Sequence, residues 1–170
     1  MNKYIAPPLG LIDHNNLKDN EGKLLTINYE MFPDENTMLF KKEAYLIVST
    51  DYYSKIKKVR RFTQSELPLR SLPWIVDQIE NGFFKRKDEG GFSNFKRSTT
   101  AEFEGETIGV NAMMHCCAEN VPGLNIWNGN RKDYIASITP QVWDIPIHML
   151  KDGLLDELKA IAKKYENGTL

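Results

Sequence analysis

The amino-acid sequence predicts an α+β protein with antiparallel sheets. Two groups of short apolar, β-branched and aromatic stretches occur along the chain, and each group is followed by a stretch with the apolar spacing of a helix. Runs of strands followed by helices favour antiparallel sheets. The chain has 170 residues, 41% of them hydrophobic and 26% charged, which suits one globular domain with its own core. We therefore expect a single domain containing two units, each made of strands and then a helix.

The predicted organisation divides this domain into four segments. Residues 1–22 are rich in Asn, Asp, Pro and Gly, which indicates an irregular arm. The first strands-and-helix unit covers residues 23–84, a basic loop covers 85–98, and the second unit covers 99–170.

The first unit begins with segments of strand-like composition. Residues 23–32 predict a strand, 33–36 (PDEN) a turn, and 37–50 one or two strands, with a possible turn at 51–54. In residues 55–63 (KIKKVRRFT) basic side chains separate the apolar ones, which predicts a strand with a strongly charged exposed side.

A helix is expected at residues 72–81. Ser71 is a possible N-cap, and Pro73 lies in the first turn, where its missing N–H is harmless. Gly82 occupies the position of a C′ glycine. The apolar residues that share one helix face are Leu72, Ile75, Val76 and Ile79.

The second unit begins with two expected strands, 100–107 and 108–119, joined near Gly105. Residues 123–129 and 132–139 predict a hairpin around Asn128-Gly129-Asn130, because Asn-Gly is a strong hairpin signal.

A helical region is then expected up to Tyr165. Thr139 is its predicted cap and Pro140 lies in its first turn, while Pro146 and Gly153 interrupt it. The apolar stripe of its second half is Leu154, Leu155, Leu158, Ile161 and Ala162.

The segment 123–161 carries a resemblance to a known family. It resembles the C-terminal part of the single-stranded DNA-binding proteins of the positive-cofactor-four and Whirly group, whose hairpin leads into a hydroxyl-Pro-x-x-Trp helix start; Thr139, Pro140 and Trp143 match that pattern. In the Whirly branch the strands-and-helix unit occurs twice, and RSLPWIVDQI and SITPQVWDIP suggest such a repeat here. The resemblance implies a Whirly-like fold, association through helices, and binding of single-stranded DNA on exposed sheet surfaces without strong sequence specificity.

Charge is unevenly distributed, although the net charge is only -1. Between Lys55 and Arg97, eleven Lys or Arg stand against five Asp or Glu, so this segment carries +6 and the rest of the chain about -7. Such asymmetry suggests one basic face and a polyanionic partner.

Basic and aromatic residues are interleaved in this segment, as in sites that track phosphates with cations and stack bases on aromatic rings. The candidate contacts of the first half are Lys55, Lys57, Lys58, Arg60, Arg61, Phe62, Lys85, Arg86, Lys87, Phe92, Phe95, Lys96 and Arg97. Those of the second half are Trp127, Arg131, Lys132 and Tyr134. Convergence of these clusters on one face would favour nucleic-acid binding. The alternatives are a solvated charged strand, a polar loop and ordinary hairpin packing.

The sequence contains no motif for metal or catalytic chemistry. His115, Cys116 and Cys117 are adjacent, whereas zinc ligands come in spaced pairs, and neighbours on a strand point to opposite faces. Gly90-Gly91 is not followed by the Lys-Ser/Thr of a phosphate-binding loop. We expect no metal or other cofactor, no catalytic residues and no enzymatic activity.

The remaining expectations concern location and partners. No apolar run approaches the roughly 20 residues of a membrane span, and the first 16 residues lack signal-peptide features. Two neighbouring cysteines favour a reducing compartment, so we expect a cytoplasmic protein, in the host cytoplasm if the source is viral. The expected partners are single-stranded DNA or RNA and further copies of the chain, as a dimer or tetramer. The alternative function is a small protein-binding module or inhibitor, for example phage-encoded, without catalysis.

Overall fold

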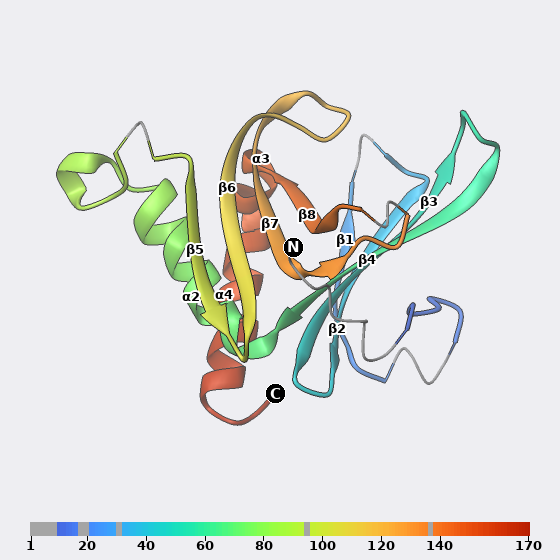
Figure 1. The fold of residues 1–170 in the computed structure, drawn as a ribbon, viewed down its shortest axis with the longest axis horizontal. Helices are drawn as coiled ribbons and strands as arrows, with labels where there is room; N and C mark the ends of the chain where they lie inside the picture. Colours follow the sequence, from blue (N-terminus) through green and yellow to red (C-terminus); the bar gives the residue numbers. More distant parts are fainter. Residues whose placement is uncertain (1–9, 17–20, 30–31, 94–95, 136–137) are drawn as a thin grey trace.

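A computed structural model describes residues 10–16, 21–29, 32–93, 96–135 and 138–170 of the chain. It confirms the α+β fold with antiparallel sheets (Figure 1). Two four-stranded sheets have the orders β1-β2-β3-β4 and β5-β6-β7-β8, so each is a meander in which consecutive strands are neighbours. A helical segment follows each sheet.

The first sheet consists of β1 (Lys23–Asn28), β2 (Glu35–Lys42), β3 (Tyr45–Ser54) and β4 (Val59–Pro68). Two expectations for this sheet are wrong. Residues 51–54 do not turn but extend β3, and residues 55–58 form the turn instead of starting the next strand. Lys58 has a left-handed backbone (φ 52°), which helps to close the hairpin so that Ser54 pairs with Val59.

The helix expected after the first sheet is present, with different ends. A 3₁₀ turn (Leu69–Ser71), α2 (Leu72–Asp77) and a π-helical turn (Gln78–Phe83) follow one another directly. Ser71 does not cap through its side chain, because its hydroxyl donates to the carbonyl of Pro68 at 2.7 Å. Gly82 is not a C′ residue but lies inside the π turn, where the Phe92 ring fills the space that a Cβ would need.

The second sheet consists of β5 (Ser98–Phe103), β6 (Glu106–Cys116), β7 (Val121–Lys132) and β8 (Pro140–Pro146). The turn near Gly105 is confirmed, with φ 81° at that glycine. The hairpin expected around Asn128-Gly129-Asn130 is wrong, because β7 runs through these residues. The Trp127 indole lies against Gly109 and Gly129, so here glycine makes room for a ring instead of forming a turn.

The helix start expected at Thr139-Pro140 is also wrong. Pro140 begins strand β8, and Trp143 pairs with Ile126 of β7 within the sheet. Proline is tolerated because β8 is an edge strand and Pro140 is its first residue. The strand expected at 132–139 is absent from residues 133–135, 138 and 139, and residues 136–137 lie outside the described part.

The second helical segment begins at α3 (Ile147–Met149) and continues through a π-helical turn (Leu150–Leu154) into α4 (Leu155–Glu166). The predicted apolar stripe of α4 is buried. The true correspondence between the two units is the proline that ends each last strand, Pro68 and Pro146, which directly precedes the helical segment. RSLPW and SITPQVW therefore have different structures, helix and strand.

The main apolar core lies between the two sheets and the two helical segments. α2 packs against α4, and Figure 1 shows them side by side behind the second sheet. A smaller cluster lies on the other face of the first sheet, where Ile12 covers Phe40 and Ile47. The helices thus cover one part of the molecule and leave the β3–β4 hairpin projecting from it (Figure 1).

Replacing Gly109 by alanine is expected to reduce the free energy of unfolding by about 1–3 kcal/mol, because the added Cβ would collide with the Trp127 indole. Urea denaturation measures the loss. In a Trp127→Ala background the same substitution should have little effect, since the collision is gone. Equal losses in both backgrounds would contradict this account.

Candidate functional site

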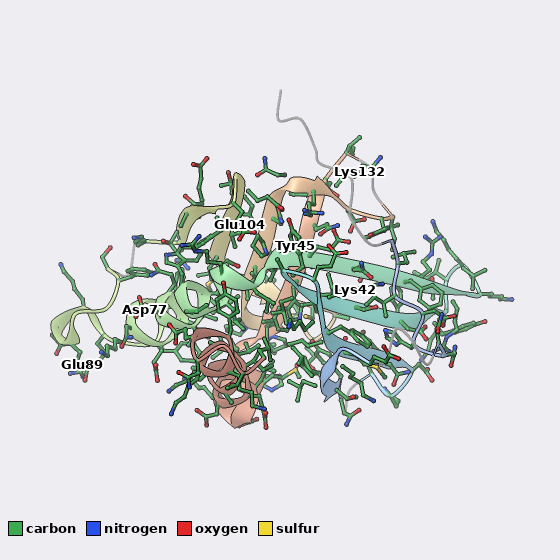
Figure 2. All side chains as sticks on the ribbon, turned by 90° about the horizontal axis from the view of Figure 1, so that it is seen from below. Lys42, Tyr45, Asp77, Glu89, Glu104 and Lys132 are labelled. Atoms are coloured by element: carbon green, nitrogen blue, oxygen red, sulfur yellow. The ribbon has the colours of Figure 1, made fainter. Side chains whose placement is uncertain are left out.

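The predicted contact residues occupy three separate places. Residues 55–62 lie at the β3–β4 hairpin, 85–93 and 96–97 in the loop before β5, and 127–134 on and after β7. Figure 1 shows the hairpin and the loop at opposite ends of the molecule's longest axis, and Figure 2 shows Glu89 of the loop at one extreme. The clusters do not converge on one face, so each must be judged separately.

The hairpin tip, residues 53–61, is rich in cations. Lys55, Lys57 and Lys58 are exposed, and none forms an ion pair with another residue of the described ranges. Arg60 is bound to Asp51 by two hydrogen bonds of 2.8 and 2.9 Å. Three lysines are therefore available to a ligand at the end of the hairpin.

Aromatic and apolar side chains accompany these cations. Tyr53 is 42% exposed and pairs with Arg60, while Arg61 pairs with Tyr52 and Phe62 with Asp51. Ile56, at the turn, is 95% exposed. The hairpin tip thus combines positive charge with uncovered apolar surface.

The loop before β5 is more self-contained. Arg86 contacts Asp88 at 2.8 Å, and Lys96 lies over the Phe92 ring, 4.0 Å from its centre. The Phe92 ring packs edge-on against Phe83 and fills the space at Gly82. Phe92 is thus a packing residue of the loop.

The other described cations of this loop are exposed, and one of them contacts a side chain of β6. The exposed Lys85 and Lys87 flank Arg86, and the Arg97 guanidinium contacts Met114 Sδ at 3.6 Å. Phe95 lies outside the described residues.

Of the β7 group, only Lys132 is exposed (Figure 2). Arg131 is only 2% exposed, and Trp127 packs over glycines. The Tyr134 hydroxyl donates to Glu66 at 2.9 Å. Arg131, predicted as a ligand contact, is therefore a structural residue, because burial removes its guanidinium from any phosphate.

Arg131 forms the centre of a buried polar network between the two sheets. Its guanidinium donates to Glu66 of β4 at 2.8 Å and to both carboxylate oxygens of Glu106 of β6 at 2.6 and 2.7 Å. It also bonds the Tyr45 hydroxyl at 2.9 Å, and Asn128 donates to Glu106 at 2.6 Å. Buried charges are tolerated only when paired and hydrogen-bonded, and both conditions are met here.

The contacts of Glu106, Tyr45 and Arg131 shift the pKa values of these three side chains. Burial works to raise the pKa of Glu106, but hydrogen bonds from Arg131, Asn128 and Tyr45 outweigh it and hold that pKa below its usual value. Burial and the bond to Glu106 raise the pKa of Tyr45 to about 12. Burial works to lower the pKa of Arg131, but the bonds to Glu106 raise it. Glu106 and Arg131 therefore stay charged at neutral pH.

A cleft of about 670 Å³ opens between the two sheets beside the hairpin. Its floor includes Thr37, Thr50 and Thr63, which are directly paired across β2, β3 and β4. Its aromatic lining residues are Tyr29, Phe32, Tyr52, Tyr53 and Trp143. Its charged lining residues are Asp34, Glu35, Lys55, Asp133 and Asp144. Burial raises the pKa of Glu35.

Sequence reasoning missed both the network and the cleft. The position of Glu66 in the sequence could have drawn attention to it, because it is the one charged residue in the stretch 62–68 that ends at Pro68. Nothing in the chain order pairs it with Arg131, 65 positions later. The threonine row likewise exists only through strand register.

Comparison with known proteins finds no matching family model and no matching curated sequence. Within the described ranges, no three His, Cys, Asp or Glu side chains are grouped as metal ligands. In that same part of the chain, no helix is both long and apolar enough to cross a membrane.

Arg131→Met is expected to lower the free energy of unfolding at pH 7 by about 3–5 kcal/mol, because it leaves Glu66 and Glu106 buried without their cation. The matched control is Lys132→Met, which removes one positive charge from the neighbouring exposed position and should stay within about 0.5 kcal/mol of wild type. Urea denaturation measures the free energy of unfolding of both variants. Similar losses in the two variants would refute a specific role for Arg131.

The stability of the wild type should fall in acid partly through Glu106. Its lowered folded pKa means that its contribution is present above the unfolded value of about 4.3 and is lost as pH falls through the folded pKa. Glu106→Gln removes the ionisable carboxyl group. The difference between the free energies of unfolding of wild type and this variant should therefore be smaller at pH 3 than at pH 6. Glu104 lies at the exposed turn nearby. For Glu104→Gln, urea titrations should give the same difference in free energy of unfolding from wild type at both pH values.

Proposed function

We propose that the protein binds single-stranded nucleic acid through its hairpin tip, without strong sequence specificity. The observation that carries the proposal is the set of three exposed lysines, Lys55, Lys57 and Lys58, which form no ion pair within the described chain. They lie at the end of the β3–β4 hairpin, which projects from the rest of the molecule (Figure 1). Exposed cations without an ion pair attract phosphates. When they bind, counterions are released from the nucleic acid.

The surroundings of the lysines support a single-stranded ligand. Tyr53 is partly exposed beside them, and base stacking on such a ring contributes roughly 1–3 kcal/mol. Lys55 and Tyr53 also line the cleft, whose volume lies within the range of about 300–1,000 Å³ that small-ligand sites occupy. Bases of a single strand held by the lysines are free to stack on Tyr53 or enter the cleft, whereas the bases of a duplex are already paired and stacked on one another.

The cleft also limits what the ligand can place there. Asp34, Glu35 and Asp144 line it, so phosphates are disfavoured inside it. Carboxylates accept hydrogen bonds from the N–H groups of bases, which are the exocyclic amino groups of adenine, cytosine and guanine and the ring N–H of thymine and guanine. The proposed arrangement therefore keeps the phosphates on the hairpin lysines and turns bases toward the cleft.

The test compares two double variants that change net charge equally. Lys55→Ala/Lys57→Ala should weaken binding of a fluorescent oligo-dT, measured by anisotropy, and reduce the slope of log affinity against log salt by up to about 1.4, or about 0.7 for each lost phosphate contact. Lys85→Ala/Lys87→Ala, at the opposite end, should bind like wild type. Equal weakening in both variants would indicate non-specific attraction, and no binding by wild type at low salt would reject the proposal.

A protein partner is the second candidate function, favoured by Ile56. It is 95% exposed, and Tyr53 and Val59 of the same hairpin tip are 42% and 45% exposed; a group of exposed apolar side chains is a feature of protein-interaction sites. Recovery of a stoichiometric protein partner that survives nuclease treatment and is lost in Ile56→Ser would favour this function.

A further inference from the structure

Two neighbouring thiols lie where β6 ends. Cys116 is the last residue of the strand, and Cys117 begins the turn of residues 117–120 that leads to β7. Their Sγ atoms are 3.3 Å apart. A disulfide needs about 2.05 Å between sulfurs, so the two sulfurs already lie close together, and a bond between these neighbours also requires a local change of the backbone.

The two thiols have different access to solvent. Cys116 is completely buried, and it packs against Gly123, where no Cβ could be accommodated beside it. Cys117 is exposed and lines the cleft, with its sulfur 3.7 Å from the Asp144 carbonyl oxygen. An oxidant from solvent therefore meets Cys117 first, while Cys116 is held behind it.

The exposed and the buried thiol also differ in pKa. The hydrogen bond from the Cys116 thiol lowers the pKa of Cys117, outweighing burial and the nearby carboxylates. The interaction with Cys117, and then burial, raises the pKa of Cys116. The thiolate is the reactive form of cysteine, so the exposed residue is also the better nucleophile.

We propose that Cys117 and Cys116 form a peroxide-reactive pair, in which Cys117 is oxidised first and Cys116 then closes a disulfide between the two neighbours. The geometry that supports this is an exposed sulfur in contact with a buried one. Redox-sensing cysteines are typically accessible and placed next to such a resolving thiol. The inference does not rest on nucleic-acid binding.

The reaction balances with a hydroperoxide as the only oxidant. The Cys117 thiolate attacks one peroxide oxygen; the O–O bond breaks, an S–O bond forms, and the released alkoxide takes a proton and leaves as an alcohol or water. Cys117 is now a sulfenic acid, oxidised by two electrons. The Cys116 sulfur then attacks the Cys117 sulfur; the S–O bond breaks, and the hydroxyl leaves as water with the Cys116 proton.

A metal explanation fits these thiols less well. Zinc sites require about four ligands, and within the described part of the chain no third His, Cys, Asp or Glu joins the pair in a metal-binding group. A single reactive thiol without a partner would proceed to irreversible acids under excess peroxide. The neighbouring Cys116 offers the reversible route.

The full-length chain provides a convenient readout. No Lys or Arg occurs between Ser98 and Arg131, so trypsin releases both cysteines in one peptide, residues 98–131. After hydrogen peroxide at low molar excess, the wild-type peptide should become lighter by about two mass units, the loss of two hydrogens, and dithiothreitol should reverse this. Non-reducing electrophoresis should show a monomer.

Two variants separate the roles of the thiols. In Cys116→Ala, Cys117 should accumulate as a sulfenic acid that dimedone traps; in Cys117→Ala, Cys116 should react at least tenfold more slowly. Circular dichroism verifies that both variants fold, and wild type unfolded in guanidinium shows whether the fold accelerates the reaction. Dimedone trapping in wild type equal to that in Cys116→Ala, rapid oxidation of Cys117→Ala, or equal rates for folded and unfolded chains would each overturn the proposal.

Discussion

One buried guanidinium determines how the two sheets meet. Arg131 of β7 holds Glu106 in its own sheet and Glu66 and Tyr45 in the other, so a single side chain spans the junction. The remaining oxygen of Glu66 accepts from Gln64 and Tyr134, which leaves no carboxylate oxygen of the pair unbonded. Such a network contributes little net stability over a packed apolar core. Any other orientation of the two sheets, however, would leave a charged side chain buried without its partner. Its effect is therefore to select one arrangement.

That arrangement explains where the accessible features lie. β3 and β4 have ten residues each, and their core-facing ends, Tyr45 and Pro68, lie at the junction with the second sheet. The opposite ends extend past the body and become the hairpin tip. The cleft forms where β8 diverges from the first sheet, beyond the contact of Ser65 with the Val142 carbonyl at 2.8 Å. Hairpin and cleft are thus both results of sheets joined at one end only.

Local patterns predicted the class of the fold but not its details. Apolar spacing identified both helical regions, and composition identified most strands. Pro140 misled because a helix N-terminus and an edge strand both tolerate proline, and only the pairing of Trp143 with Ile126 distinguishes them. Asn128-Gly129 misled because the glycine accommodates Trp127. For the candidate site, the hairpin lysines were predictable from charge, whereas the burial of Arg131 depends on a carboxylate from the other half of the chain.

The separation of the hairpin tip from the basic loop before β5 affects how the protein attracts a polyanion from a distance. Positive charge lies at both ends of the long axis, and the rest of the chain carries an excess of negative charge, with a net charge of -1. At a distance these contributions largely cancel, and salt screens what remains beyond about 8 Å at physiological ionic strength. A polyanion would therefore experience no long-range steering toward the hairpin and would feel attraction only after a close encounter. Association should accordingly be slow for an electrostatic complex.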